Sequence, residues 1–203
     1  MAPVTNIIFD LGGVLLNLDV PKTSQAFKAL GLTQIDELFR IGFATSFFRD
    51  YEMGVISDEE FVEKALELTA PGTTKAEVIT AWNDMLLDFP AERVALLKQL
   101  QSKYRIYLFS NTNQLHLLHF HQAYRAVYGN DMDDLFIKAY YSHLIKMRKP
   151  DVAAFEYVIK DSGVKAAETL FIDDALVNVE GANKAGLQGL HLTNGKTILD
   201  LGL

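Results

Sequence analysis

The chain has 203 residues, 49% of them hydrophobic and 22% charged, a composition typical of a globular protein with a sizeable core. Its formal net charge is −7 and its only basic cluster is Lys146-Met147-Arg148-Lys149, so we expect no nucleic-acid partner. The sequence has no cysteine, which excludes disulfides, thiol catalysis and cysteine-ligated zinc. The first residues do not resemble a signal peptide, and no apolar segment is long enough to span a bilayer. We therefore expect a cytoplasmic protein without membrane contacts.

The first predicted element is a buried strand at about residues 5–10, an apolar run that ends on Asp10. A carboxylate in this place can attack phosphorus or carbon and form a covalent intermediate. Gly12 and Gly13 follow, and glycines allow backbone N–H groups to approach a bound anion closely. A turn aspartate beside turn glycines is the alternative interpretation of the same residues.

Residues 18–88 contain no convincing strand and show helical patterns instead. Ser57 and Glu60 have the spacing of a capping box at the start of one of these helices. Because the segment is too long for a crossover loop, we predict an inserted all-helical cap at 18–88. The core then consists of residues 1–17 and 89–203. The helices of the cap are expected at Pro21–Leu30, Gln34–Ile41, Thr45–Met53, Asp58–Ala70 and Lys75–Leu87.

After the cap, strands and helices alternate. This alternation predicts an α/β fold with a doubly wound parallel sheet, a Rossmann-like core. Ligands bind beyond the carboxyl ends of such strands, so polar residues at the strand ends should meet at one edge of the sheet. The later strands are expected at about 105–110, 138–142, 169–173 and 187–192, and the later helices at about 90–103, 114–129, 151–162 and 178–185.

Two groups, one at the end of the second strand and one further along the chain, can bind an anion. The Ser110 hydroxyl can donate to a phosphate oxygen with help from the Asn111 backbone N–H, although a helix N-cap is an equally ordinary role for this serine. Lys149 can neutralise charge on a nucleophile and a phosphate as a point charge. A surface lysine before a proline is the alternative for Lys149.

Asp173 and Asp174 stand side by side where the 169–173 strand ends. Two like charges there are unfavourable unless a cation or hydrogen-bond donors compensate them. Mg²⁺ is the natural candidate because it takes carboxylate and water ligands and bridges to phosphate. Asn178 is placed to orient a ligand of that metal. The alternative is an acidic pair stabilised by a helix N-terminus.

These motifs together resemble those of the haloacid dehalogenase-like hydrolase superfamily, over the whole chain. The predicted cap also resembles its helical cap, which lies between its first and second motifs. The sequence Glu52-Met-Gly-Val-Ile-Ser and the residues around the later motifs look like the subgroup of sugar phosphatases that act on α-D-glucose 1-phosphate. The four matching motifs are Asp10-Leu-Gly-Gly-Val, Ser110-Asn111, Lys149-Pro150 and Asp173-Asp174.

The resemblance implies that Asp10 is a nucleophile that forms an aspartyl phosphate. It also implies Mg²⁺ held by Asp10, the Gly12 carbonyl and Asp174, with Asp173 close by as a direct or indirect ligand. Phosphoryl transfer depends mainly on such positioning and charge stabilisation. The groups that would hold the phosphoryl group are Ser110, Asn111 through its backbone, and Lys149.

Gly12 is a departure from the superfamily pattern, because most of its phosphatases carry an aspartate there as general acid and then base. A missing acid costs about 10²–10⁴ in rate where the leaving group needs a proton. The subgroup of glucose 1-phosphate phosphatases also has glycine at this position, so the departure does not imply inactivity. Two alternatives stay open: a 2-haloacid dehalogenase-type hydrolase, and a phosphate-binding or regulatory module with little turnover. The acidic pair argues against the dehalogenase, which needs no metal.

Two further residues are candidate substrate contacts. Glu52 in the cap can contact sugar hydroxyls, or it can be a solvated helix glutamate. His116 lies one turn beyond Asn113 and can line the mouth of the pocket, whereas a metal role for the nearby histidines lacks further ligands. The sequence thus predicts a Mg²⁺-dependent phosphatase for a small phosphorylated metabolite, with a sugar phosphate favoured. It gives no prediction of oligomeric state.

Overall fold

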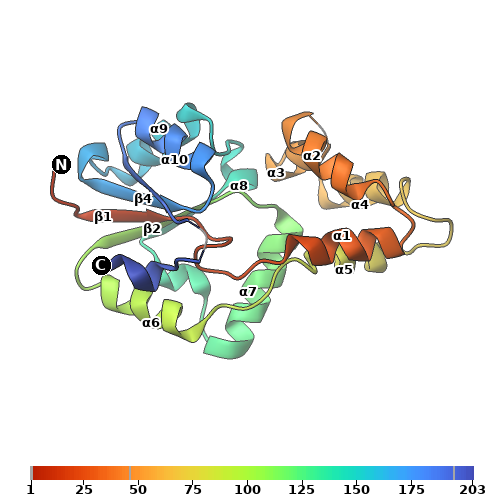
Figure 1. The fold of residues 1–203 in the computed structure, drawn as a ribbon, viewed down its shortest axis with the longest axis horizontal. Helices are drawn as coiled ribbons and strands as arrows, with labels where there is room; N and C mark the ends of the chain where they lie inside the picture. The colour runs from red at the N-terminus through yellow and green to blue at the C-terminus, as the bar shows by residue number, and fades with distance from the viewer. Residues whose placement is uncertain (1, 46, 194) are drawn as a thin grey trace.

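The computed structural model describes residues 2–45, 47–193 and 195–203, and the side chains of 41–45 lie outside this description. Within these residues one parallel sheet of five strands forms the centre, in the order β3-β2-β1-β4-β5 (Figure 1). This confirms the predicted doubly wound parallel sheet. The strands are β1 (Asn6–Phe9), β2 (Arg105–Ser110), β3 (Lys138–Tyr141), β4 (Thr169–Asp173) and β5 (Gln188–His191).

Helices cover both faces of the sheet because successive side chains of a buried strand point to opposite faces. Ile7 and Phe9 of β1 pack in one core with side chains of α6 and α7, and Ile8 packs in another with side chains of α9 and α10. Figure 1 shows these two helical layers above and below the strands. The helices are α6 (Ala91–Leu100), α7 (Gln114–Tyr128), α9 (Val152–Ser162) and α10 (Leu176–Lys184).

Short helices complete the core. Ser142, which the sequence places in a strand, instead begins the one-turn helix α8 (Ser142–Ile145) directly after β3. Its hydroxyl accepts a hydrogen bond from the Thr112 backbone N–H at 2.9 Å, which accounts for the change of direction at this point. The 3₁₀ helices are Met132–Leu135, Ala166–Glu168 and Ile198–Leu201.

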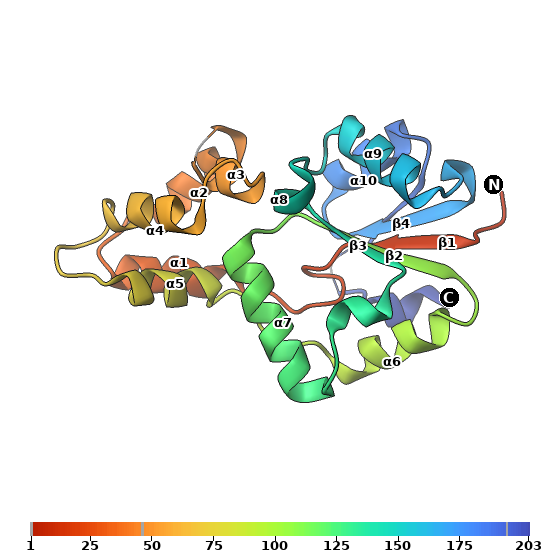
Figure 2. The ribbon, with the colours of Figure 1, turned by 180° about the vertical axis from the view of Figure 1, so that it is seen from behind.

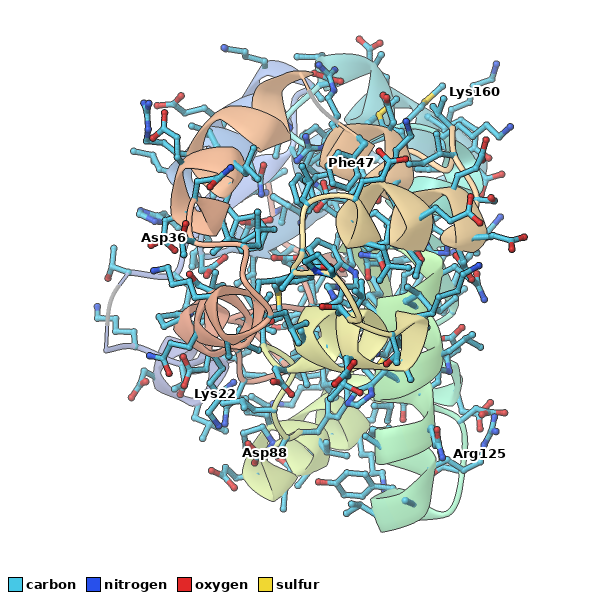
Figure 3. The ribbon with its side chains drawn as sticks, turned by 90° about the vertical axis from the view of Figure 1, so that its right-hand side faces the viewer. Lys22, Asp36, Phe47, Asp88, Arg125 and Lys160 are labelled. Carbon is cyan, nitrogen blue, oxygen red and sulfur yellow. The ribbon has the colours of Figure 1, made fainter. Side chains whose placement is uncertain are left out.

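The helices that lie between β1 and α6 in the chain form a separate lobe (Figure 2). They pack around aromatic side chains of their own, with Trp82 only 1% exposed at the centre. Figure 3 looks onto the end of this lobe, where Asp36 and Phe47 mark α2 and α3. The predicted capping box is confirmed, since Ser57 and Glu60 exchange hydrogen bonds. The lobe contains α1 (Val20–Ala29), α2 (Ile35–Thr45), α3 (Phe47–Glu52), α4 (Asp58–Leu66) and α5 (Lys75–Asn83).

The two chain segments that join the lobe to the core run side by side. Leu18 and Leu86 form an antiparallel bridge, and Asn17 exchanges backbone hydrogen bonds with residues 87 and 88. Residues 85–88 pair with residues 17–19, which explains why α5 ends at Asn83 rather than at the predicted Leu87. We propose that the cap boundaries lie at residues 17/18 and 88/89, on these paired segments.

Helix α4 ends at Leu66, four residues before the predicted end. The Thr69 hydroxyl donates to the Leu66 carbonyl at 2.8 Å and so satisfies one of the free carbonyls at this helix end.

Among the described residues, no helix combines the length and the apolar character that crossing a membrane requires.

Candidate active site

Three polar side chains of distant sequence position meet at the carboxyl edge of the sheet. Asp10 follows β1 directly, Ser110 ends β2 and Asp173 ends β4. These strands are parallel neighbours in register, so their ends lie together. All three residues are buried, with exposures of 8%, 3% and 0%. As predicted, the polar residues at the strand ends therefore lie together at one edge of the sheet.

Lys149 lies between the carboxylates of Asp10 and Asp173. Its Nζ is 2.7 Å from Asp10 Oδ1 and 2.6 Å from Asp173 Oδ2, and the residue is only 1% exposed. The Asn111 side chain fixes the lysine backbone, because Asn111 Oδ1 accepts from Lys149 N and Asn111 Nδ2 donates to Lys149 O, both at 2.9 Å. This burial excludes a surface lysine. The asparagine side chain has a positioning role that the sequence reasoning, which considered only its backbone, did not identify.

The electrostatics of this group follow from burial and proximity. Burial raises the pKa of Asp10 to about 7, the Lys149 charge opposes this shift, and the Asp173 charge adds to it. Burial by itself lowers the pKa of Lys149, but the two adjacent carboxylates outweigh it and the net shift is upward. The lysine therefore stays a cation and provides fixed positive charge where a phosphate oxygen would carry negative charge.

The carboxylates of Asp10, Asp173 and Asp174 each offer an oxygen, and these oxygens lie within 4.8 Å of one another. Asp173 already accepts at both oxygens: Oδ1 from Ala175 N and Asn178 Nδ2, and Oδ2 from Lys149 Nζ and Asn178 Nδ2. Asp174 is exposed at the edge of the site. A cluster of carboxylate oxygens suits a hard divalent cation such as Mg²⁺.

Gly13 allows Asp174 to lie in this cluster. A Cβ atom on Gly13 would stand 2.3 Å from Asp174 Oδ2, and the backbone φ of Gly13 is +73°. Both facts require glycine, since left-handed φ values are unfavourable for other residues. The contact with Asp174 and the positive φ therefore explain why position 13 is a glycine. The carboxylates of the cluster fit the Mg²⁺ ion that the sequence predicts.

A cavity of about 170 Å³ opens beside the strand ends. Five of its lining residues are predicted site residues: Gly12, Glu52, Ser110, Asn111 and His116. The rest of the lining is mostly apolar and includes Leu18, Trp82 and Met85. The sequence analysis did not identify Leu18 or Met85 as candidate site residues. Their position on the two segments that join cap and core was the available signal.

His116 presents its ring, rather than a free nitrogen, to this cavity. Nε2 lies 3.0 Å from the Trp82 carbonyl and must donate to it, so Nδ1 accepts from Asn113 Nδ2 at 3.1 Å. The imidazole also stacks on the Trp82 ring, with centroids 4.8 Å apart. Burial lowers the pKa of His116 to about 4, so the ring is neutral at pH 7. His116 therefore links core helix α7 to cap helix α5.

Glu52 is the last residue of α3 and lies beside Arg148, with its side chain only 12% exposed and Oε2 at 3.1 Å from Arg148 Nη2. Burial raises the pKa of Glu52, and the charges of Arg148 and Lys149 oppose this shift. The Ser142 hydroxyl donates to the Glu52 carbonyl at 2.7 Å and attaches α3 to the core. Glu52 is therefore not a solvated helix glutamate, because it lies inside the cavity at the cap–core interface.

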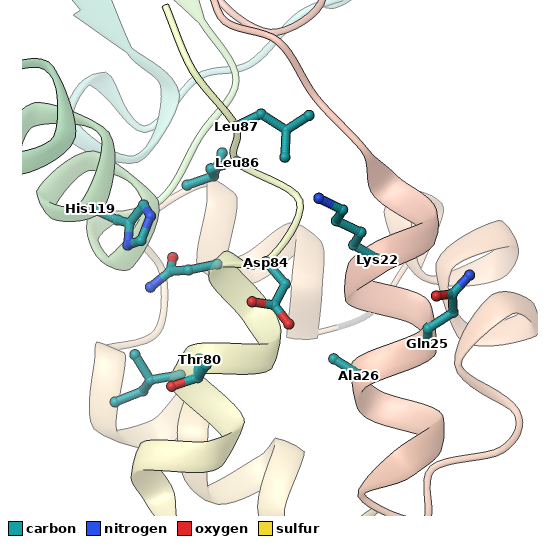
Figure 4. Close-up of a pocket in the computed structure, with 10 residues that line it drawn as sticks. Lys22, Gln25, Ala26, Thr80, Asp84, Leu86, Leu87 and His119 are labelled. Atoms are coloured by element: carbon teal, nitrogen blue, oxygen red, sulfur yellow. The ribbon is translucent and has the colours of Figure 1, made fainter.

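A larger open groove of about 700 Å³ lies elsewhere, between α1, α5 and α7 (Figure 4). Lys22, Asp84 and His119 line it, and none of the predicted site residues does. The described residues of this groove do not include a set of clustered carboxylates. The smaller cavity is the candidate active site because its lining includes Gly12, two residues after Asp10, and Ser110, at the end of the strand that pairs with β1.

Comparison with known proteins agrees with this geometry. The chain is 31% identical to a D-ribitol-5-phosphate phosphatase of Bacteroides thetaiotaomicron, covering 95% of this chain and 93% of that protein. It is 32% identical to a sesquiterpene phosphatase of Aspergillus oryzae, covering 92% and 89% respectively. A crystal structure of a related enzyme from Bacteroides thetaiotaomicron, in complex with magnesium and inorganic phosphate, superposes with a TM-score of 0.91 at 32% identity, covering 98% of this chain and 100% of that one.

The profile of one enzyme family extends over both the core and the inserted helices. It matches residues 4–186, a span that contains all four motifs at the strand ends as well as the cap. The superfamily resemblance inferred from these motifs is confirmed. This chain belongs to the haloacid dehalogenase-like hydrolase family.

Proposed function

We propose that this protein is a Mg²⁺-dependent phosphatase that cleaves a small phosphorylated metabolite, with a sugar or polyol phosphate as the favoured substrate. The observation that carries the proposal is Lys149, buried between Asp10 and Asp173 at the carboxyl edge of the sheet. A cation fixed there, next to a carboxylate and a hydroxyl, is an arrangement suited to phosphoryl transfer.

Asp10 is the proposed nucleophile. Its carboxylate attacks phosphorus and forms an aspartyl phosphate, which water then hydrolyses. Lys149 neutralises charge on the carboxylate and the phosphoryl oxygens, and Ser110 donates a hydrogen bond to one of those oxygens. Asn111 contributes its backbone N–H and, through its side chain, holds Lys149 in place.

Mg²⁺ would be held by the carboxylates of Asp10 and Asp174 and by the Gly12 carbonyl. It would supply positive charge that offsets the repulsion between these carboxylates and a phosphate dianion. Asp173 acts indirectly in this proposal, because four hydrogen bonds already occupy its two oxygens. The similar enzyme crystallised with magnesium and inorganic phosphate supports Mg²⁺ as the metal.

The cavity favours a small leaving group. Its volume of about 170 Å³ is below the roughly 300–1,000 Å³ of pockets that bind drug-sized ligands, so it suits a compact sugar or polyol better than a terpenoid chain. Glu52 is the polar group that would contact substrate hydroxyls, opposite an otherwise apolar wall. The ribitol-5-phosphate phosphatase supports the polyol class more directly than the sesquiterpene phosphatase does.

Phosphate release tests this function. The panel contains sugar phosphates, polyol phosphates, nucleotides and p-nitrophenyl phosphate, with Mg²⁺ or with chelator, for the wild type and Asp10→Asn. Release that requires both Mg²⁺ and Asp10 is expected. Halide release from a 2-haloacid in chelator would instead establish the dehalogenase. Trapping of a phosphate mimic without turnover would establish the binding module.

A further inference from the structure

The proposed phosphatase lacks a proton donor and acceptor at position 12, which is Gly12. An alcohol leaves as an unstable alkoxide unless a group in the site protonates it, and the attacking water must later lose a proton. Gly12 has no side chain to do either. A Cβ atom on Gly12 would lie 2.6 Å from Leu18 Cδ1, so the Leu18 side chain occupies the space where an acid at position 12 would begin.

The described residues that line the cavity offer two titratable side chains, Glu52 and His116. His116 is unsuitable because both its nitrogens are hydrogen-bonded within the protein, to Asn113 and to the Trp82 carbonyl. Glu52 Oε2 is buried and accepts no hydrogen bond from any described group, although it forms the ion pair with Arg148. Oε2 itself is inaccessible to water, but the Glu52 side chain is 12% exposed and lines the cavity, so its carboxyl group can reach a ligand there.

We propose that Glu52 of the cap is the general acid and then the general base of this site, in place of the residue missing at Gly12. This inference rests on the proposed function. In the first step an Asp10 oxygen bonds to phosphorus, the bond from phosphorus to the leaving oxygen breaks, and Glu52 gives its proton to that oxygen. In the second step water bonds to phosphorus, the bond to Asp10 breaks, and Glu52 takes the proton from water. Glu52 is thereby restored to its protonated form.

Both protonation states of Glu52 have structural support. Burial favours the neutral carboxyl, the form required to protonate the leaving group. Arg148 Nη2 at 3.1 Å favours the carboxylate, the form required to accept a proton from water. A catalytic acid that must also act as a base is most effective when neither form is strongly preferred.

The cap helix that carries Glu52 is held on the core, as a catalytic group requires. The Ser142 hydroxyl donates to the Glu52 carbonyl, and the Leu115 N–H donates to the Tyr51 hydroxyl at 3.1 Å. Gly54 lies so close to the His143 carbonyl that a Cβ atom would stand 2.2 Å from that oxygen. Figures 1 and 2 both show α3 against α8.

The test compares Glu52→Gln with the wild type on two leaving groups: a polyol phosphate, which needs a proton, and p-nitrophenyl phosphate, which does not. We expect kcat/KM for the polyol phosphate to fall by about 10²–10⁴ and kcat/KM for p-nitrophenyl phosphate by less than about tenfold. Because the base is also lost, p-nitrophenol should appear as a burst of about one equivalent per enzyme, followed by slow turnover. Glu67→Gln, on an exposed cap residue, is the matched control and should show no burst.

A role in substrate recognition alone would raise KM for the polyol phosphate and leave p-nitrophenol release steady without a burst, and that result overturns the proposal. If Glu52→Gln does not fold, as judged by circular dichroism, the wild type decides. Its kcat/KM on aryl phosphates should depend only weakly on leaving-group pKa, and a steep dependence overturns the proposal. A wild type that releases phosphate from no substrate refutes the proposed function itself.

Discussion

Replacing Gly13 by alanine tests the geometry of the metal site. The new Cβ atom would stand 2.3 Å from Asp174 Oδ2, a distance that a carbon–oxygen contact does not allow, so the Asp174 carboxylate must move away. The backbone adds strain, because at φ +73° an alanine costs about 1–2 kcal/mol relative to glycine. For a protein of 203 residues, this strain should lower Tm by roughly 2–8 °C.

The displaced carboxylate should weaken metal binding. Disturbing the groups around a metal site typically costs about 10–100-fold in affinity, equivalent to about 1.4–2.8 kcal/mol. We therefore expect the Mg²⁺ concentration for half-maximal phosphate release to rise by that factor in Gly13→Ala. The assay is a Mg²⁺ titration of phosphate release, paired with a calorimetric titration of Mg²⁺ binding.

Gly129→Ala separates the two effects. Gly129 has a φ of +78°, close to that of Gly13, but a Cβ atom there would meet nothing within 4 Å. It should lower Tm by a similar amount and leave the Mg²⁺ requirement unchanged. An unchanged Mg²⁺ requirement in Gly13→Ala would refute the placement of Asp174 among the ligands. An equal rise in both variants would show that general destabilisation, and not the contact with Asp174, is the cause.

Three further predictions concern hydrogen bonds at the site. Asn178→Ala removes the amide that donates to both Asp173 oxygens, so calorimetry should show Mg²⁺ affinity reduced about 10–100-fold in a folded protein. Asn111→Ala removes both bonds to the Lys149 backbone, so kcat should fall while the Mg²⁺ requirement stays within about twofold. The pKa of His116 is lowered from 6.5 to about 4, so its contribution to stability is full above pH 6.5 and is lost as pH falls to about 4. Urea unfolding should show the wild type losing up to about 3 kcal/mol more than His116→Gln across that window, and parallel curves would contradict the buried neutral ring.

Local sequence was sufficient to predict the five strands and the edge of the sheet at which their polar residues meet. Apolar runs that end on Asp10, Ser110 and Asp173 predict strands whose carboxyl ends carry the chemistry, and a parallel sheet necessarily brings those ends together. The capping box at Ser57 was equally readable, because it depends on residues three positions apart. The doubly wound fold and the family followed from these signals.

Helix ends in the cap were less readable. The pattern predicts a helix to Leu87, but the chain leaves the helix after Asn83 because residues 85–88 pair with residues 17–19, far away in sequence. Ser142 likewise begins a helix because its hydroxyl bonds to the backbone of Thr112. Propensity cannot predict such ends, since tertiary hydrogen bonds decide them.

The sequence by itself determined which side chains are candidates for the chemistry, because strand ends, glycines and acidic pairs are local signals. Only the tertiary structure decided which groups each of those side chains contacts. In the folded protein Lys149 lies between two carboxylates. Both oxygens of Asp173 and both ring nitrogens of His116 form hydrogen bonds within the protein. The tertiary structure also brought Glu52 of the cap beside Arg148 of the core. Contacts between residues nearly a hundred positions apart depend on how the cap sits on the core, which no local pattern encodes.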